Sequence, residues 1–311
     1  MHLFYMEIRE KFFNVIIVGA GHAGCEAALA CAKLGLKTLV LTINMDKVAL
    51  MPCNPAIGGV GKTQLVLELD ALGGQMAKTA DKTTIQMRML NRSKGPAVQS
   101  LRAQIDKKEY EIVMKRVLEN TENLTLRQGI VNGVLIKNNK ICGVKTETGV
   151  TFLSDSVIIT PGTFLRGRII LGNKDYIAGR MGEYSATGLS LSLIKMGFEL
   201  DRFQTATPPR VDKRTVDFSK MDIQPGEDMP TKFSSWNEDK VYENIPSFLT
   251  YTNEKTHNVI RNNLHYSPIK SGMVKTHGPR HCPSIDFSSP LSVLIIFCCM
   301  PAGMLVVNPL R

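Results

Sequence analysis

The 311-residue sequence predicts an α/β fold that opens with a parallel strand-helix-strand unit. A short β-branched run, Asn14 to Val18, ends at a glycine-rich turn, and an alanine-rich segment follows it up to Leu34. A second apolar run then spans Thr38 to Leu41, which completes the order strand, helix, strand. Apolar residues make up 43% of the chain and charged residues 21%, so we expect a globular protein with a large core.

The turn after the first strand carries the dinucleotide-binding pattern GxGxxG. Gly19 permits a tight turn, Gly21 lets the backbone approach a pyrophosphate, and Gly24 lets the helix pack closely on the strand. The helix N-terminus adds amide donors and a favourable dipole. The predicted cradle therefore comprises Gly19, Ala20, Gly21, His22, Ala23 and Gly24. Because a strand precedes it and a helix follows, we expect a Rossmann-like dinucleotide site rather than a purely structural turn.

The end of the second strand decides between dinucleotides. An Asp or Glu that binds the ribose of NAD usually lies about 20 residues after the glycines. The sequence reads Thr42-Ile43-Asn44 there. Thr42 or Asn44 can hydrogen-bond a ribose hydroxyl, but the missing carboxylate disfavours NAD in this site. FAD is compatible because many other contacts hold it, so we expect FAD.

A second glycine-rich stretch, Ala56 to Thr63, satisfies a relaxed Walker A pattern. A P-loop needs a buried strand directly before it, and the segment Met51 to Pro55 contains two prolines. We therefore disfavour nucleoside triphosphate binding and expect these glycines to let a loop pass close to the flavin.

Two of the seven cysteines, Cys53 and Cys282, lie in loops punctuated by proline or glycine, where functional residues concentrate. A nearby cation, Lys62 or Arg280, could favour the thiolate nucleophile, although an inert thiol is an equally open alternative. We expect Cys25 and Cys31 to be small buried apolar residues. The cysteines show no metal-ligand spacing, and no role follows from the spacing of His257, His277 and His281.

Basic residues concentrate between Arg88 and Arg116, with eight Lys or Arg against three acidic residues in a chain of net charge +10. Apolar residues recur at helical spacing from Ala97 to Leu118, which predicts an amphipathic helix. An ordinary solvated face is one interpretation, and binding of nucleic-acid phosphates is the other. The candidate phosphate-binding residues are Arg88, Arg92, Lys94 and Arg102.

The chain divides, by pattern, into three parts. Residues 1–162 form the first part of the dinucleotide domain. Short strand-like runs suggest a β-meander within it, at residues 124–127, 131–136, 141–146, 150–153 and 157–160. Residues 163–286 are more polar and rich in proline, which suggests an inserted α+β domain. Residues 287–311 form an apolar tail with three prolines and no charge before Arg311. A membrane span of about 20 residues is one interpretation of the tail; the prolines favour a foreign or frame-shifted end.

These residues closely resemble the tRNA uridine-5-carboxymethylaminomethyl modification enzymes, also called the glucose-inhibited division protein A family. The similarity spans about residues 12 to 286. Its blocks are Gly19 to Gly24, Cys53 to Gly59, Asp70 to Gly74, Asn91 to Val98, Thr207 to Arg210, Thr250 to His257 and the motif around Cys282.

The resemblance implies a cytoplasmic homodimer that uses FAD, NADH and methylene-tetrahydrofolate, with a GTPase partner, to modify C5 of the wobble uridine U34 in tRNA. By motif match, Cys53 and Cys282 correspond to the family's functional cysteines. Val131 and Ser185, or Ala186 beside it, fall at flavin contacts. The nicotinamide-binding stretch corresponds to Gly278, Pro279, Arg280 and His281, so the inserted domain of residues 163–286 is the expected NADH and substrate domain.

Two departures leave alternatives open. The match stops where Phe287 follows Asp286, and family members are about twice as long. We therefore expect a truncated copy that lacks the second part of the FAD domain and the C-terminal helical domain. A generic FAD/NAD(P)H oxidoreductase and an inactive fragment remain the alternatives. The N-terminus lacks the features of a signal peptide, so we expect a cytosolic protein.

Overall fold

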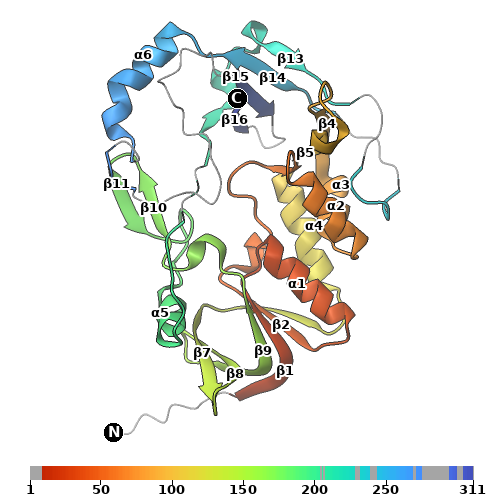
Figure 1. The fold of residues 1–311 in the computed structure, drawn as a ribbon, viewed down its shortest axis with the longest axis vertical. Coiled ribbons are helices and arrows are strands. Elements are labelled where there is room, and N and C mark those ends of the chain that lie inside the picture. Colours follow the sequence, from red (N-terminus) through yellow and green to blue (C-terminus); the bar gives the residue numbers. More distant parts are fainter. Residues whose placement is uncertain are drawn as a thin grey trace. The chain divides into compact units, whose positions relative to one another are not determined.

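The computed structural model describes residues 9–203, 205, 207–227, 232–238, 244–268, 271–274, 294–299 and 304–310. The chain forms two compact units that interleave in sequence (Figure 1). Unit 1 comprises Met1–Leu50 and Glu111–Asp201, and unit 2 comprises Met51–Tyr110 and Arg202–Arg311. Each unit is discontinuous in sequence, and residues 51–110 of the expected first part cluster with residues 202–311. The assignment of a FAD domain and an NADH domain stays a prediction.

A six-stranded sheet of order β6-β2-β1-β9-β8-β7 forms the centre of unit 1. Strands β6, β2, β1 and β9 run parallel, whereas β9, β8 and β7 form an antiparallel meander. The strands are β1 (Arg9–Val18), β2 (Thr38–Thr42), β6 (Leu124–Gln128), β7 (Val131–Lys137), β8 (Lys140–Thr146) and β9 (Thr151–Ile159). Both the opening parallel unit and the meander agree with the sequence prediction.

The core of unit 1 lies between this sheet and its helices. Ile16, Leu39 and Val144 are fully buried in it. Helix α1 contacts β1 and β2, and α5 contacts β7. The remaining elements of this unit are α1 (His22–Lys33), η1 (Met45–Lys47), η3 (Gly162–Phe164), β10 (Arg168–Leu171), β11 (Lys174–Ile177) and α5 (Thr187–Lys195); α4 (Lys107–Glu119) begins in unit 2 and continues into unit 1.

Strand β9 is longer than expected. The sequence suggested separate strands at 150–153 and 157–160, because the polar residues Ser154, Asp155 and Ser156 interrupt the apolar pattern. They form one strand because β1 pairs alongside from Thr151 to Ile159 and supplies the ladder through the polar segment.

Unit 2 contains two antiparallel sheets, of order β3-β5-β4 and β12-β16-β15-β14-β13. The first is formed by β3 (Ala56–Gly58), β4 (Thr84–Leu90) and β5 (Ser100–Ile105), with α2 (Thr63–Ala71), α3 (Met76–Thr83) and η2 (Pro96–Val98). The second is formed by β12 (Arg210–Asp212), β13 (Asp222–Gln224), β14 (Ser247–Tyr251), β15 (Leu294–Cys299) and β16 (Met304–Leu310), with η4 (Lys213–Thr215), η5 (Phe218–Lys220), α6 (Glu254–Asn263) and η6 (Leu264–Tyr266).

The helix predicted from Ala97 to Leu118 was wrong in its first half. Residues 100–105 form β5, which lies between β3 and β4 and pairs with both. Pairing on two sides satisfies its backbone groups, so tertiary context overrides the helical spacing. Helix α4 begins only after Asp106, whose carboxylate accepts hydrogen bonds from the amides of Lys108 (2.9 Å) and Glu109 (3.2 Å). An Asp with a Glu three residues later is a helix-start signal that the sequence does contain.

Two strands of the apolar tail, β15 and β16, pair antiparallel with each other. Strand β15 also pairs with β14 and β16 with β12, so these two strands complete the five-stranded sheet. Among the described residues, no helix combines the length and the apolar character that a membrane span requires.

Candidate functional site

The glycine turn at the end of β1 is built around close backbone contacts. Gly19 has φ +104°, and a Cβ placed there would lie 2.4 Å from the carbonyl oxygen of Thr160. A Cβ on Gly24 would lie 1.9 Å from the carbonyl oxygen of Gly19. Around Gly21, by contrast, a Cβ would meet no described atom within 4 Å. The first and third glycines are therefore required by packing, whereas the second leaves open space where a pyrophosphate would approach.

Three hydrogen bonds hold the turn in place. The amide of Gly19 donates to Leu41 O (2.8 Å), and the amide of Ala49 donates to Ala20 O (2.8 Å). Thr160, directly after β9, donates its hydroxyl to Val18 O (3.0 Å) or Gly19 O (3.1 Å). No local motif marks Thr160, because it acts on a turn 141 residues away in the chain.

Helix α1 begins at His22 with Gly21 as its N-cap, and no described side chain caps it. Its first turn contains no acidic residue, so the positive end of the helix dipole remains available to an anion. Burial lowers the pKa of His22 to about 4, so its imidazole is neutral at physiological pH. This arrangement fits a pyrophosphate, and Ala23 and Gly24 lie in the same helical turn.

The loop after β2 lies where a ribose-binding residue was expected. Thr42 is buried, and its hydroxyl lies 3.5 Å from Asn44 O. The Asn44 side chain accepts a hydrogen bond from the amide of Asp46 (2.9 Å), so it already caps η1. Thr42 and Asn44 thus stabilise the loop itself, and a ribose contact from either stays a prediction.

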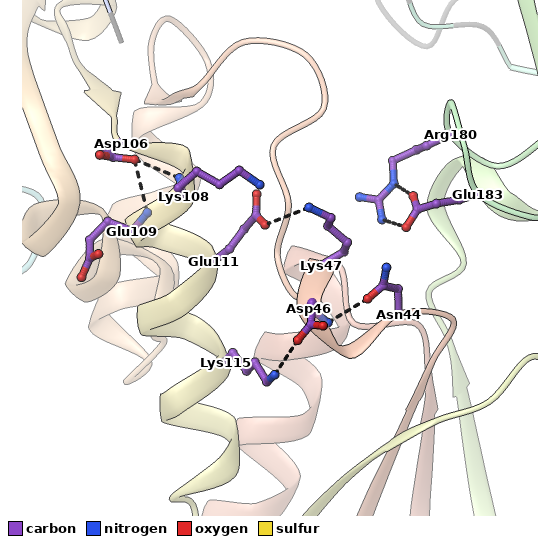
Figure 2. Close-up of polar contacts among 10 residues, drawn as sticks. All are labelled: Asn44, Asp46, Lys47, Asp106, Lys108, Glu109, Glu111, Lys115, Arg180 and Glu183. Carbon is purple, nitrogen blue, oxygen red and sulfur yellow. Dashed lines mark hydrogen bonds and ion pairs between the residues drawn. The ribbon is translucent and has the colours of Figure 1, made fainter. Parts of the chain in front are cut away.

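Two ion pairs join this loop to α4 (Figure 2). Asp46 pairs with Lys115 (2.9 Å), and Lys47 pairs with the buried Glu111 (3.9 Å). The hydrogen bond from Lys115 lowers the pKa of Asp46. One of the cations in the basic stretch, Lys115, therefore has a structural partner.

The remaining candidates of unit 1 have structural contacts. Val131 is buried in the core at the start of β7. The Ser185 hydroxyl donates to Phe164 O (3.0 Å), and the Ala186 amide donates to the same oxygen (2.8 Å). Nearby, Arg180 forms a two-bond pair with Glu183 (Figure 2). Flavin contacts at Val131 and Ser185 stay predictions.

In unit 2, Cys53 is a half-buried cysteine thiol in the loop before β3. Arg210 donates to the carbonyl oxygens of Pro52 (3.3 Å) and Cys53 (3.2 Å). The adjacent Asn54 has a buried Oδ1 without a hydrogen-bond partner among the described residues, and a ligand could satisfy this acceptor. Cys25 differs from Cys53: it is fully buried, and burial raises its pKa to about 12.

The segment that resembles a Walker A motif is not a P-loop. Its strand, β3, has only three residues and pairs antiparallel at the edge of its sheet. The Thr63 hydroxyl, which would bind Mg²⁺ in a P-loop, lies 2.6 Å from Leu101 O.

The candidate phosphate-binding residues separate into two groups. Arg88 on β4 and Arg102 on β5 lie directly opposite each other, so their side chains share one face of the sheet. Burial and, to a smaller extent, the charge of Arg92 lower the pKa of Arg88. Arg92 forms an ion pair with Glu227, and Lys94 is exposed.

The other candidates lie outside the described residues or are structural. Cys282, Gly278, Pro279, Arg280, His281 and His277 all lie outside the described residues. His257 is buried, and its Nε2 lies 2.9 Å from the hydroxyl of Thr252 near the start of α6. No group of three or more potential metal ligands occurs in the part of the chain that the structure describes.

A parallel strand-turn-helix-strand unit with this glycine geometry defines a Rossmann-type protein of the dinucleotide-binding class. The family model described as "Glucose inhibited division protein A" matches residues 14–293. The chain therefore belongs to the glucose-inhibited division protein A family. The match continues beyond residue 286, where we expected it to end.

Its similar relatives include proteins named tRNA uridine 5-carboxymethylaminomethyl modification enzyme MnmG. The one from Caldicellulosiruptor saccharolyticus is 53% identical over 281 residues, covering 90% of this chain and 45% of that protein. The one from Bacillus subtilis is 53% identical over 274 residues, covering 88% and 44%. The crystal structure of Aquifex aeolicus GidA (form I) is similar with a TM-score of 0.89 and 45% identity, covering 96% of this chain and 52% of that one. The chain thus spans about half the length of these relatives.

Proposed function

We propose that this chain is the FAD-binding N-terminal part of an enzyme that adds the carboxymethylaminomethyl group to C5 of the wobble uridine U34 in tRNA. The glycine cradle of unit 1, in a chain 53% identical to proteins named for this modification, carries the proposal. NADH serves as reductant and methylene-tetrahydrofolate as one-carbon donor. A GTPase partner, a homodimer and a cytoplasmic location complete the proposal by family resemblance.

The cradle residues hold the pyrophosphate of FAD in this proposal. The amides at the start of α1 donate to the phosphate oxygens, and the open space around Gly21 admits them. A neutral His22 adds no charge at neutral pH. The bound flavin supplies two-electron redox chemistry. Thr160 keeps the turn in its phosphate-accepting shape through its bonds to the Val18 and Gly19 carbonyls.

Cys53 and Cys282 are the proposed functional thiols. Cys53 is half-buried, whereas the fully buried Cys25 has a raised pKa and is unsuited to nucleophilic chemistry. The buried Asn54 Oδ1 offers an acceptor to a ligand beside Cys53.

Binding of tRNA phosphates is assigned chiefly to Arg88 and Arg102. These two arginines lie opposite each other on paired strands and share one face of the sheet, so a phosphate that binds there can contact both side chains. Arg92 already pairs with Glu227 and contributes less, and Lys94 contributes as an exposed charge. The alternative, a generic FAD/NAD(P)H oxidoreductase, has no need of the arginine pair.

Titration of the purified chain with FAD, followed by flavin fluorescence, tests the cofactor. Saturable binding that Gly21→Ala weakens supports the proposal. Failure to bind FAD would leave the inactive fragment as the remaining interpretation for this chain.

Binding of tRNA at several salt concentrations tests the substrate. We expect Arg88→Ala and Arg102→Ala each to reduce the slope of log affinity against log salt by about 1, because each removes one phosphate contact. Arg92→Ala is the matched control and should change the slope less. Flavin binding with no tRNA affinity would favour the generic oxidoreductase.

A further inference from the structure

Arg210 supplies hydrogen bonds that the Cys53 loop cannot make for itself. Pro52 and Pro55 lack an amide hydrogen, which leaves the loop short of backbone donors. Yet each backbone carbonyl from Pro52 to Pro55 accepts a hydrogen bond. Arg210 donates to the first two, the Ala56 amide donates to Asn54 O (2.9 Å), and the Ile105 amide donates to Pro55 O (2.8 Å). One guanidinium therefore donates to two of these four carbonyl groups.

The charge of Arg210 faces the loop without a competing anion. No carboxylate of the described residues forms an ion pair with Arg210, whereas the nearby Asp212 is taken by Arg214. Arg210 is half-buried and begins β12, which pairs with β16 in the register Arg210 to Val306. The strand from the apolar tail thus supports the backbone that carries the guanidinium.

We propose that Arg210 is a positioning residue for Cys53: its guanidinium fixes the carbonyls of Pro52 and Cys53 and places a positive charge beside the thiol. The functional meaning rests on the proposed role of Cys53 as a nucleophile. A cation beside a cysteine favours the reactive thiolate, and a fixed loop holds that thiolate in one orientation. From the sequence, Lys62 and Arg280 were the candidate cations.

Two measurements on the purified chain test this inference, and neither requires catalytic activity. The first is hydrogen exchange of the loop amides Cys53, Asn54 and Ala56. The second is the pH profile of Cys53 alkylation by iodoacetamide, read from the Cys53 peptide by mass spectrometry. A change in the accessibility of the thiol multiplies the alkylation rate by the same factor at every pH. A change in a neighbouring charge instead shifts the pH at the midpoint of the profile.

We expect Arg210→Ala to speed loop exchange at least several-fold and to raise the alkylation midpoint by about half a pH unit to one unit. Arg210→Lys should keep most of the midpoint while loosening the loop, because it retains the charge but not the planar fork. Arg214→Ala is the matched control: it removes an arginine of the neighbouring turn that contacts Asp212, and should change neither readout. Lys62→Ala tests the other cation of this segment.

An Arg210→Ala protein that melts like the parent but shows unchanged exchange and an unchanged midpoint would overturn the inference. A midpoint that moves with Lys62→Ala and not with Arg210→Ala would assign the charge to Lys62 and refute the electrostatic part. Since neither readout requires FAD or tRNA, failure of the proposed function and failure of this inference are separable.

Discussion

Gly24 provides the sharpest test of the cradle, because its neighbours are backbone and cannot move aside cheaply. A methyl group there would lie 1.9 Å from Gly19 O and 2.8 Å from the Thr160 hydroxyl. That hydroxyl is itself bonded to the turn. Gly24→Ala must therefore push α1 away from the end of β1 or break the Thr160 contact.

The expected cost follows from two opposing effects. Overpacking of this kind costs about 1 to 3 kcal/mol or more. Alanine in place of glycine inside a helix recovers up to about 1 kcal/mol. We expect a net loss of about 1 to 2 kcal/mol in the free energy of unfolding, which lowers the melting temperature by several degrees. Affinity for FAD should fall as well, because the helix amides shift away from the phosphates.

Gly21→Ala is the matched control for thermal unfolding followed by circular dichroism. Its φ of −73° suits alanine, and a Cβ there meets no described atom within 4 Å. We expect stability within about 1 kcal/mol of the parent, since only an N-cap preference changes, together with weakened FAD binding. A Gly24→Ala protein that melts within a degree of the parent would refute this account of the turn.

Three further outcomes are expected. Burial lowers the pKa of His22 to about 4, whereas the same histidine titrates near 6.5 in the unfolded chain. The free energy of unfolding should therefore be highest above pH 6.5 and fall by up to about 3 kcal/mol as the pH drops to 4. In denaturant titrations His22→Gln should flatten this part of the pH profile, and an unchanged profile would contradict the lowered pKa. Cys25, with its pKa raised to about 12, should alkylate at pH 8 more than about 100-fold more slowly than a free cysteine, and rapid labelling in the folded protein would contradict its burial. In urea unfolding, Asp81→Ala should destabilise unit 2 by about 2 to 4 kcal/mol, because the amides of Phe233 (2.8 Å) and Ser234 (2.9 Å) lose their acceptor. Asp81→Asn keeps one oxygen acceptor and should cost less. Equal losses of stability in the two variants would contradict this explanation.

Two misplaced elements share a physical cause. The helical spacing of residues 97–118 continued through β5, whose conformation depends on partners on both sides. The polar break at Ser154 to Ser156 looked like a strand end, yet β1 carries the ladder across it. In each case the deciding hydrogen bonds come from another strand, which a local pattern does not contain.

The glycine turn was predictable from residues 14 to 42 because its requirements are local: Gly19 must adopt a positive φ, and the helix that follows presents its own amides. The contacts that hold the candidate sites are not local. The Thr160 hydroxyl reaches the turn across 141 residues of sequence, and Arg210 reaches Cys53 across 157. Such pairs meet only after the sheets have assembled, so the contact of Arg210 with the Cys53 loop belongs to the tertiary structure.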